Sequence, residues 1–382
     1  MAVMNFAKMC AVVFAALSFS SNTHAAHLAS GAEGVAPVGY GQRALGGCTD
    51  SGCLCKVTNL NDSGPGSLRE CVSTENPKWV IFGQGGRGTV RLKSPLFVHS
   101  STTIDGRGPT PVTLTTVEDH VMVIRNAENV IINDLKFAVI AISARCRTPK
   151  RADDTIRCGG GILVDGSSKD IWIHQNLFEE CGGKCIALWT LKSTRQGADL
   201  VTISNNIFRN SFYGVLMGAS HSLADSEVPL MRATLYRNYF YNVQRRSPRA
   251  SGLSHMHVLN NVVEDWGGKS CDGRRPKAFG ASSVSGAQML LENNFFSARG
   301  SADECKAAVK IDGGFVKANG NLSKNGAMIQ NNLPKRVFNP RAPAPERYDY
   351  VPDKMTNALR AQIIDAAGPQ WTVLSRRLPV AH

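Results

Sequence analysis

The chain repeats a short unit in which apolar side chains alternate over a few residues and most copies then reach an asparagine. The pattern recurs at residues 130–137, 171–178, 201–208, 233–240, 256–263, 289–296 and 328–334. A period of two predicts β-strands. The aligned asparagines are Asn176, Asn206, Asn238, Asn261, Asn294 and Asn332, at intervals of 23 to 38 residues. Such intervals are typical of solenoid coils with loops of variable length, whereas a β-sandwich does not repeat one unit so regularly.

The repeat predicts how the chain buries its apolar residues. Each coil contributes about three short strands, and a single coil has no partner for its apolar face. Stacked coils bury a continuous column of apolar side chains, while parallel ladders satisfy the backbone. Asparagine tolerates the left-handed turn conformation, and stacked amides can bond along the axis. We therefore assign the asparagines a structural role and predict an all-β fold of stacked coils over residues 26–340.

The two ends of such a stack are sheet edges that need covers. Ser67 and Glu70 are spaced as a capping box, so a short helix is expected to begin at Ser67 and to cap the first coil. Strands are expected at 79–82, 89–92, 96–99 and 102–105. Residues 341–382 are expected to form a tail that shields the side or the other end, with a helix at 354–367.

Residues 1–25 have the pattern of a secretory signal peptide. Lys8 precedes the apolar run 10–19, and small residues at 23–25 offer a cleavage site. The run is too short to span a membrane, and no later stretch is long and apolar enough. We therefore expect a secreted or periplasmic protein without a membrane partner, and we expect a monomer.

Ten cysteines remain once Cys10 leaves with the signal, and an even number in an exported chain favours disulfides. Close spacing suggests local pairs without fixing the connectivity. The suggested pairs are Cys146 with Cys158, Cys181 with Cys185, two among Cys48, Cys53, Cys55 and Cys71, and Cys271 with Cys305.

The chain carries a formal net charge of +13, which favours a polyanionic partner. Nucleic acid, an anionic lipid surface and an acidic polysaccharide all meet that description. Export favours the polysaccharide, and no nucleic-acid-binding motif is visible. We expect an acidic polysaccharide such as polygalacturonate, pectin or another polyuronate.

Several motifs together resemble polysaccharide lyase family 1, the pectate and pectin lyases. They are VTNLNDSGPGSLREC (57–71), TTIDGRG (102–108), IWIHQ (171–175), VTISNN (201–206), LMG (216–218) and RSPR (246–249). The resemblance covers roughly residues 37–300. It implies a single-stranded right-handed parallel β-helix that cleaves 1,4-linked polyuronates by β-elimination.

That reaction needs a base to remove the proton next to the uronate carboxyl. The family uses an arginine, and Arg246 matches it, followed in register by Pro248 and Arg249. A guanidinium is normally protonated. Crowding by Arg245 and Arg249 should lower its pKa, and neighbouring cations should stabilise the developing negative charge. A solvated basic turn is the alternative interpretation of this cluster.

The sequence departs from the family at the calcium site. Positions that carry carboxylates in the family align with Gly160, Gly183 and Ala187. Three supporting cations of the family align with Tyr213, Ser251 and Trp189. The usual calcium ligands are therefore missing, so we assign no metal ligand and leave calcium as an open cofactor. Asp153, Asp154, Glu179 and Glu180 could build a displaced site, although a solvated loop is the simpler reading of them.

Three functions follow from this pattern. The first is a pectate lyase-like enzyme with calcium relocated or absent. The second is a calcium-independent pectin lyase, which Lys184, Trp189 and Tyr213 would suit because a methyl ester needs no metal. The third is a polyuronate-binding β-helix without activity. Arg246 is the candidate catalytic residue. The candidate substrate-binding residues are Arg249, Arg245, Lys184, Trp189, Tyr213 and His255. Hydrolysis is disfavoured, because the aligned positions have lost carboxylates.

Overall fold

The computed structural model describes residues 37–48, 51–116, 120–139, 159–219, 227, 229–267, 278–299, 305–332, 335, 337–341, 348–369 and 371. The proposed signal peptide lies outside these residues. Within them, no helix has the length and apolar character needed to cross a membrane.

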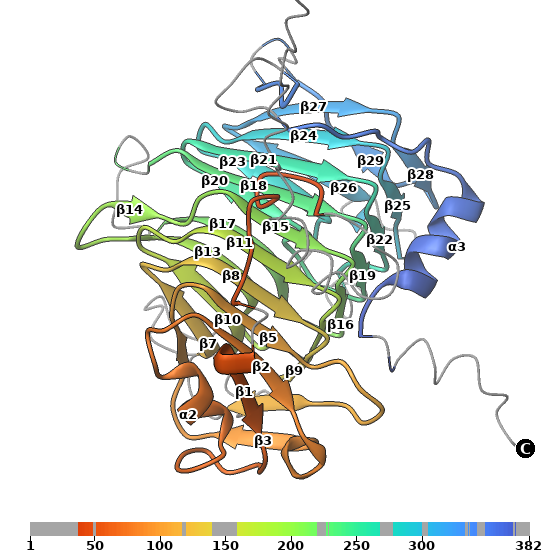
Figure 1. Ribbon diagram of the computed structural model, residues 1–382. Helices are drawn as coiled ribbons and strands as arrows, with labels where there is room; N and C mark the ends of the chain where they lie inside the picture. Colours follow the sequence, from red (N-terminus) through yellow and green to blue (C-terminus); the bar gives the residue numbers. More distant parts are fainter. Residues whose placement is uncertain are drawn as a thin grey trace, which may run out of the picture.

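Three parallel sheets wind around one axis, as expected for a right-handed parallel β-helix (Figure 1). Sheet A contains β1 (Leu54–Val57), β2 (Lys78–Phe82), β5 (Thr102–Asp105), β8 (Glu128–Asn133), β11 (Lys169–His174), β15 (Val201–Ser204), β18 (Met231–Tyr236), β21 (Ser254–Leu259), β24 (Gln288–Glu292) and β27 (Phe315–Asn319). Sheet B contains β3 (Thr89–Leu92), β6 (Thr113–Thr116), β9 (Lys136–Ala138), β12 (Leu177–Glu179), β16 (Ile207–Arg209), β19 (Tyr239–Tyr241), β22 (Val262–Glu264), β25 (Phe295–Ser297) and β28 (Leu322–Lys324).

Sheet C follows sheet B in each coil. It contains β4 (Leu96–Val98), β7 (His120–Arg125), β10 (Gly160–Asp165), β13 (Lys184–Leu191), β17 (Tyr213–Ala219), β20 (Arg249–Ser251), β23 (Ala281–Val284), β26 (Ala307–Asp312) and β29 (Met328–Ile329). A short strand, β14 (Gln196–Gly197), pairs antiparallel with β13. Short 3₁₀ turns, η1 (Ser51–Cys53) and η2 (Gln84–Gly86), belong to the first coils. The strands expected at 79–82, 89–92, 96–99 and 102–105 are present, and so are those of the repeats from residue 130 to residue 296. The repeat expected at 328–334 is reduced to β29 in sheet C among the described residues.

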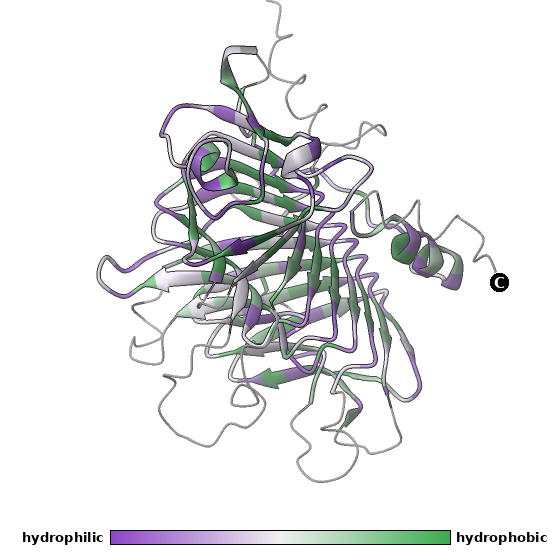
Figure 2. Ribbon diagram, turned by 90° about the horizontal axis from the view of Figure 1, so that it is seen from below, coloured by the Kyte–Doolittle hydropathy of each residue, from purple (hydrophilic) through white to green (hydrophobic). Residues whose placement is uncertain are grey.

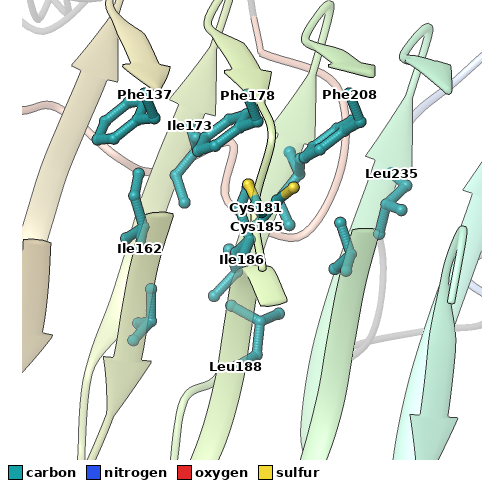
Figure 3. Packing of buried hydrophobic residues seen from close by; sticks show 14 of the residues in the cluster. Phe137, Ile162, Ile173, Phe178, Cys181, Cys185, Ile186, Leu188, Phe208 and Leu235 are labelled. Carbon is teal, nitrogen blue, oxygen red and sulfur yellow. The ribbon is translucent and has the colours of Figure 1, made fainter. Parts of the chain in front are cut away.

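Each strand pairs with the equivalent strand of the next coil, so equivalent side chains stack along the axis. Phe137, Phe178, Phe208 and Phe240 form a buried column with ring centroids 4.7, 5.0 and 4.5 Å apart. Figure 3 shows the first three of these rings. Their planes lie within 9° of parallel. Coloured by hydropathy, apolar strands stand side by side through the helix (Figure 2). This column is the core that a single coil cannot form.

An asparagine ladder runs beside the aromatic column. Each side-chain amide donates to the next asparagine's Oδ1, from Asn176 to Asn206 (3.1 Å) and from Asn206 to Asn238 (3.0 Å). The same bond continues through Asn261 and Asn294 to Asn321. The left-handed conformation belongs to the residue before each ladder asparagine, for example Asn205 with φ of 51°. The asparagines therefore tie the coils together, while the preceding residue turns the chain.

The assignment of Asn332 to this ladder was wrong. The sixth position is Asn321, which follows β27. Asn332 instead accepts a hydrogen bond from the backbone N–H of Val316, across an antiparallel bridge. The coil at 315–322 escaped the sequence pattern because Lys317 and Asn319 interrupt its apolar character.

Two of the expected local disulfides are present, and one expected pair is not bonded. Cys48 is joined to Cys53 and Cys55 to Cys71. Cys181 and Cys185 lie together in the core, as their spacing suggests, but both are thiols (Figure 3). Burial, and next a hydrogen bond between the two side chains, raise the pKa of the Cys185 thiol. Cys305 is disulfide-bonded; its partner, like Cys146, Cys158 and Cys271, lies outside the described residues.

The first coil is covered by the short helix α2 (Leu68–Val72). The Ser67 hydroxyl accepts from the backbone N–H of Glu70, as a capping box requires. The Glu70 carboxylate reaches back one residue further than expected and accepts from the Gly66 N–H at 2.6 Å. Leu68, Cys71 and Val72 are buried against the coil.

The tail shields the side of the helix. Helix α3 (Asn357–Ala366) packs on sheet B, where Leu359 and Ile363 meet Val262 and Phe295 (Figure 1). The preceding tail segment lies on sheet A, together with the N-terminal residues 38–47. The two segments meet at Thr234, whose hydroxyl accepts from the Tyr40 N–H and donates to the Tyr348 hydroxyl. Sheets A and B thus carry the terminal segments on their outer faces.

A buried polar network fastens the tail to sheet A. His257 contacts the Tyr348 hydroxyl through Nδ1 and the Glu292 carboxylate through Nε2. Tyr350 donates to the same carboxylate at 2.6 Å. Burial acts to raise the pKa of Glu292, but the hydrogen bonds outweigh it and leave the pKa at about 2. Burial also lowers the pKa of His257 and so keeps its imidazole neutral.

The network predicts acid sensitivity. The ordinary pKa of a glutamate is about 4.5 and that of Glu292 is about 2, so its contribution to stability is complete above pH 4.5 and is lost as the pH falls toward 2. Glu292→Gln should therefore lose less stability between pH 6 and pH 3 than the wild type does, as measured by thermal unfolding. Glu75→Gln, at an exposed position, is the control and should follow the wild type. An equal loss in all three proteins would contradict this role.

The ladder predicts a large cost for a single amide. Asn238 bonds to the amides on both sides and to the Ile203 carbonyl, so Asn238→Ala leaves several buried groups unpaired. We expect it to lower the free energy of unfolding by about 3 kcal/mol. Asn332→Ala, in a partly buried position, should cost about 1 kcal/mol. Denaturant unfolding measures both, and equal losses would show that the ladder adds nothing beyond ordinary hydrogen bonds.

Candidate active site

The candidate residues gather on the outer face of sheet C, because equivalent positions of successive coils fall in one row. His120 stands opposite Gly160, Lys184 opposite Tyr213, and Tyr213 opposite Arg245. Gly160 lies against the Lys184 carbonyl, which joins the two halves of the row. Neighbouring strands are about 4.8 Å apart. The register therefore brings residues from five coils to one surface, which we call the first row.

Arg246 follows the first row and is held tightly by its backbone. It has a left-handed conformation, with φ of 64°. The carbonyls of Arg245 and Arg246 accept from the N–H groups of Gly214 and Val215. A Cβ at Gly214 would lie 2.7 Å from the Arg246 carbonyl oxygen, so glycine is required for this close approach.

The Arg246 guanidinium lies on the ring of Tyr213, with its central carbon 3.8 Å from the ring centroid. Arg245 lies over the neighbouring Phe212 at 5.6 Å. Contacts of this kind hold a cation in place by the negative face of the ring, without neutralising its charge. The two arginines and the two aromatic residues thus form one interleaved cluster.

Arg249 lies on β20, where it stands opposite Leu216 of β17 and Ser282 of β23. Burial lowers the pKa of the Arg249 guanidinium; Asp312 and Tyr213 act in the opposite direction, and Arg245 acts with burial. These influences place Arg245, Tyr213 and Asp312 around Arg249. Of the three predicted arginines, Arg246 thus contacts the Tyr213 ring, Arg245 is paired with Tyr213 through the backbone, and Arg249 is near enough for Tyr213 to influence its charge.

Lys184 and Trp189 come from the same strand, β13. The Lys184 ammonium lies 5.5 Å from the centroid of the Trp189 ring. Ala187 aligns with one of the family's calcium-binding carboxylates; it lies between the two residues on the same strand and is almost fully buried. The strand that would bear that carboxylate thus carries an ammonium group.

Gly160, another of the three calcium positions, leaves no room for a metal ligand. A Cβ at Gly160 would lie 2.6 Å from Cδ2 of His120 and 2.8 Å from the Lys184 carbonyl oxygen, so a carboxylate has no room there. Glu179 is engaged by Lys136 at 2.9 Å and Arg209 at 2.6 Å. The part of the chain that the structure describes holds no group of three or more potential metal ligands. Asp153 and Asp154 lie outside it.

His255 does not belong to this site. It lies on β21 of sheet A, where its ring stacks on Phe338 of the tail at 4.7 Å. His257 faces the same side of the sheet, two residues on, and joins the tail network. His255 was expected among the substrate-binding residues, but it lies on another sheet, because period-two alternation identifies a strand and not the sheet to which it belongs.

Ser251, at the position of the family's second arginine, packs against the backbone of the neighbouring strand β17. Its hydroxyl donates to the Met217 carbonyl at 3.2 Å, and a Cβ on Gly218 would be only 1.9 Å from that hydroxyl oxygen. The side chain is thus used for packing at the strand.

Two residues at this surface were not singled out from the sequence. His120 occupies the start of the first row. Lys310 is an exposed lysine opposite Ser282, two strands beyond Arg249. Their neighbours lie in other coils, so only the register reveals them. In the sequence, His120 could have been found through the glycine that stands opposite it. Lys310 could have been found through the coil that the repeat pattern missed.

The fold and this surface define a class of protein, the right-handed parallel β-helices with a cationic site on one sheet. Comparison with known proteins identifies the family. The pectate lyase family matches residues 89–371, so the chain belongs to the pectate lyase family. It is a pectate lyase-like polysaccharide lyase.

Individual relatives agree with that assignment. Pectate lyase 1 of Cryptomeria japonica is 30% identical over 289 residues, which cover 72% of this chain and 69% of the relative. Two solved structures share the fold. The cedar pollen allergen jun a 1 has a TM-score of 0.66 at 24% identity and covers 87% of this chain and 92% of its own. A Bacillus pectate lyase in complex with trigalacturonate has a TM-score of 0.55 at 18% identity, covering 87% and 98%.

The site geometry predicts that calcium does not bind at the family's position. A ligand that binds the folded protein raises its melting temperature as its concentration exceeds the dissociation constant. We expect millimolar calcium to leave the melting temperature unchanged. Magnesium at equal ionic strength is the control and should give the same result. A rise that is specific to calcium would show that carboxylates outside the described residues complete a relocated site.

Proposed function

We propose that the chain cleaves 1,4-linked polyuronates by β-elimination on the outer face of sheet C, with Arg246 at the reacting carbon. The observation that carries the proposal is the cluster of Arg245, Arg246 and Arg249 beside Phe212 and Tyr213, with Arg246 at the position of the family's catalytic arginine. The net charge of +13 and the trigalacturonate bound by the Bacillus relative support a polyuronate as the substrate.

The chemistry requires two things of this surface. A base must remove the proton at C5, next to the carboxyl group, and cations must stabilise the negative charge that develops on that group. By precedent in the family, the arginine at position 246 is the base that removes this proton. Arg245 and Arg249 lie beside it and supply positive charge from fixed positions, which requires no reorganisation during the reaction.

Lys184 favours a calcium-independent form of this reaction. Its ammonium lies over the Trp189 ring, on the strand that has Ala187 at a calcium-ligand position. We infer that it faces the substrate carboxyl group that calcium neutralises in a pectate lyase. A methyl-esterified carboxyl group carries no charge and needs no metal. The second candidate is therefore a pectin lyase, with Trp189 and Tyr213 as apolar contacts for esterified sugars.

The extracytoplasmic location belongs to the same proposal. The bonds Cys48–Cys53 and Cys55–Cys71 suit an oxidising compartment, in which polysaccharide substrates are also found. We infer that the chain acts after export, as a monomer.

Ultraviolet absorbance of the unsaturated product tests the function. The purified protein would receive polygalacturonate or highly methylated pectin, each with calcium or with a chelator. We expect product on pectin despite the chelator, and Arg246→Ala should lower kcat by about 100- to 1,000-fold. Lys317→Ala, on sheet A, is the control and should act as the wild type. Binding of both polymers without any product would leave a carbohydrate-binding β-helix and would reject the lyase.

Product that appears only with calcium and polygalacturonate would reject the metal-free form of the proposal. Lys184→Ala separates the two forms further. If the ammonium replaces the metal, this variant should lose activity on polygalacturonate more than on pectin, because only the free carboxylate needs a counter-ion. An equal loss on both substrates would show that Lys184 acts in some other way.

A further inference from the structure

We propose that sheet C selects a partly esterified polyuronate, with methyl-esterified sugars over its N-terminal coils and free uronates over its C-terminal coils. The inference rests on the proposed function and names the substrate class within it. It starts from a second row of residues on sheet C, in which apolar side chains give way to cations along the axis. In coil order this second row contains Phe97, Val123, Leu163, Ala187, Leu216, Arg249, Ser282 and Lys310.

Alternation within each strand places the second row on the outer face. Leu163 lies between Ile162 and Val164, which both belong to the interior core. Every other member of the row also has a core residue directly before or after it in its strand; these are Leu96, Met122, Ile186, Val215, Ala250, Ala281 and Val309. Successive side chains of a strand point to opposite faces of the sheet, so the row faces outward.

The members that reach solvent differ between the two ends of the row. Phe97 is 50% exposed and Leu163 is partly exposed, whereas at the other end Arg249 is partly exposed and Lys310 is exposed. The members between and beside them, Val123, Ala187, Leu216 and Ser282, are almost fully covered. The row crosses seven steps between strands, which amounts to about 34 Å. A polysaccharide laid along it therefore meets apolar side chains at one end and cations at the other.

The charges of the strands themselves reinforce this division. Strands β4, β7 and β10 contain one arginine and no lysine. That residue, Arg125, is paired with Asp165 at 2.6 Å, so its charge is cancelled. Strands β20, β23 and β26 contain Arg249 and Lys310 against one carboxylate, Asp312. The two arginines that precede β20 increase this excess of positive charge.

The two ends suit different forms of the same sugar. A methyl ester removes the charge of a uronate and adds an apolar group, which can contact Phe97 and Leu163. A free carboxylate in the same place would lose hydration without gaining a counter-ion, which is costly. At the other end, the guanidinium of Arg249 and the ammonium of Lys310 favour a carboxylate. An esterified stretch that continues into a free stretch therefore satisfies both ends.

The reacting position falls at the boundary between the two ends. Leu216 is the last apolar member of the second row and Arg249 is the first cation, and the two are paired across β17 and β20. Arg246 directly precedes β20. The chain should thus be cut where esterified sugars meet free uronates, and the two new ends should differ in their degree of esterification.

The products of a blockwise esterified pectin test this directly. The wild type would digest the polymer briefly, and mass spectrometry would count the methyl groups next to the unsaturated end and next to the new reducing end. We expect one kind of end to be esterified and the other to be free. Equal methyl content at both kinds of end would overturn the inference.

Substitutions at the two ends should change the preference in opposite directions. The quantity to compare is kcat/KM on highly methylated pectin divided by kcat/KM on polygalacturonate. Phe97→Lys should lower this ratio by about 3- to 5-fold, and Lys310→Leu should raise it by about as much. The matched controls are Leu54→Lys, at a position 47% exposed on sheet A, and Lys324→Leu, at an exposed position on sheet B. Shifts no larger than those of the controls would reject the assignment.

Binding separates this inference from the proposed function. Retention of the wild type on immobilised polygalacturonate, highly methylated pectin and blockwise pectin needs no turnover. We expect the strongest retention on the blockwise polymer. That result without any unsaturated product would reject the lyase and keep the inference. Product formation with retention on the blockwise polymer no stronger than on the other two would keep the lyase and reject the inference.

Discussion

The register between successive coils determines almost every other feature of the molecule. Because the strands are parallel and pair in register, each side chain lies beside its counterpart from the next coil. In the interior, this places Phe178 on Phe208 and Asn206 on Asn238. On the outer face of sheet C it places Lys184, Tyr213 and Arg245 in one row, although they are distant in sequence. The same geometry that builds the core therefore builds the site.

The sequence predicted the parts of the structure that depend on the pattern within one strand. The repeat, the asparagine ladder, the capping helix and the strand positions all follow from alternation or from a local motif. Asn332 was misplaced because the coil that contains Asn321 carries Lys317 in its strand, which weakens the apolar signal. His255 was misplaced because strands of sheets A and C alternate in the same way, and the covering tail is set by contacts such as His255 with Phe338.

The candidate site shows the same division. Arg245, Arg246 and Arg249 were found because they are neighbours in the chain, and Tyr213 because it departs from a family motif. His120 and Lys310 were not found, because each is identified only by what lies opposite it in another coil. The pair Cys181 and Cys185 shows a further limit. Spacing predicted that the two side chains meet, but not whether the sulfur atoms are bonded.

Aromatic rings position two of the arginines at the site. Several guanidinium groups elsewhere face carboxylates, as in Arg125 with Asp165 at 2.6 Å and Arg209 with Glu179 at 2.6 Å. Those pairs fix the side chain and cancel its charge. On sheet C, Arg245 and Arg246 are positioned by Phe212 and Tyr213. An aromatic ring orients a cation and leaves its field intact, so positive charge is available to an anionic substrate.

This choice of partners has a chemical consequence. An enzyme that generates negative charge beside a carboxyl group gains most from cations whose position is fixed before the substrate arrives. A calcium ion meets that need in a site rich in carboxylates, but such ligands also cancel part of its charge. Here Gly160 and Ala187 provide no carboxylates, and Lys184 is held by Trp189. On this surface, aromatic residues thus hold the cations in place, as carboxylates hold the ion in a metal site. The carboxylates of the metal site are missing here, and aromatic residues are present.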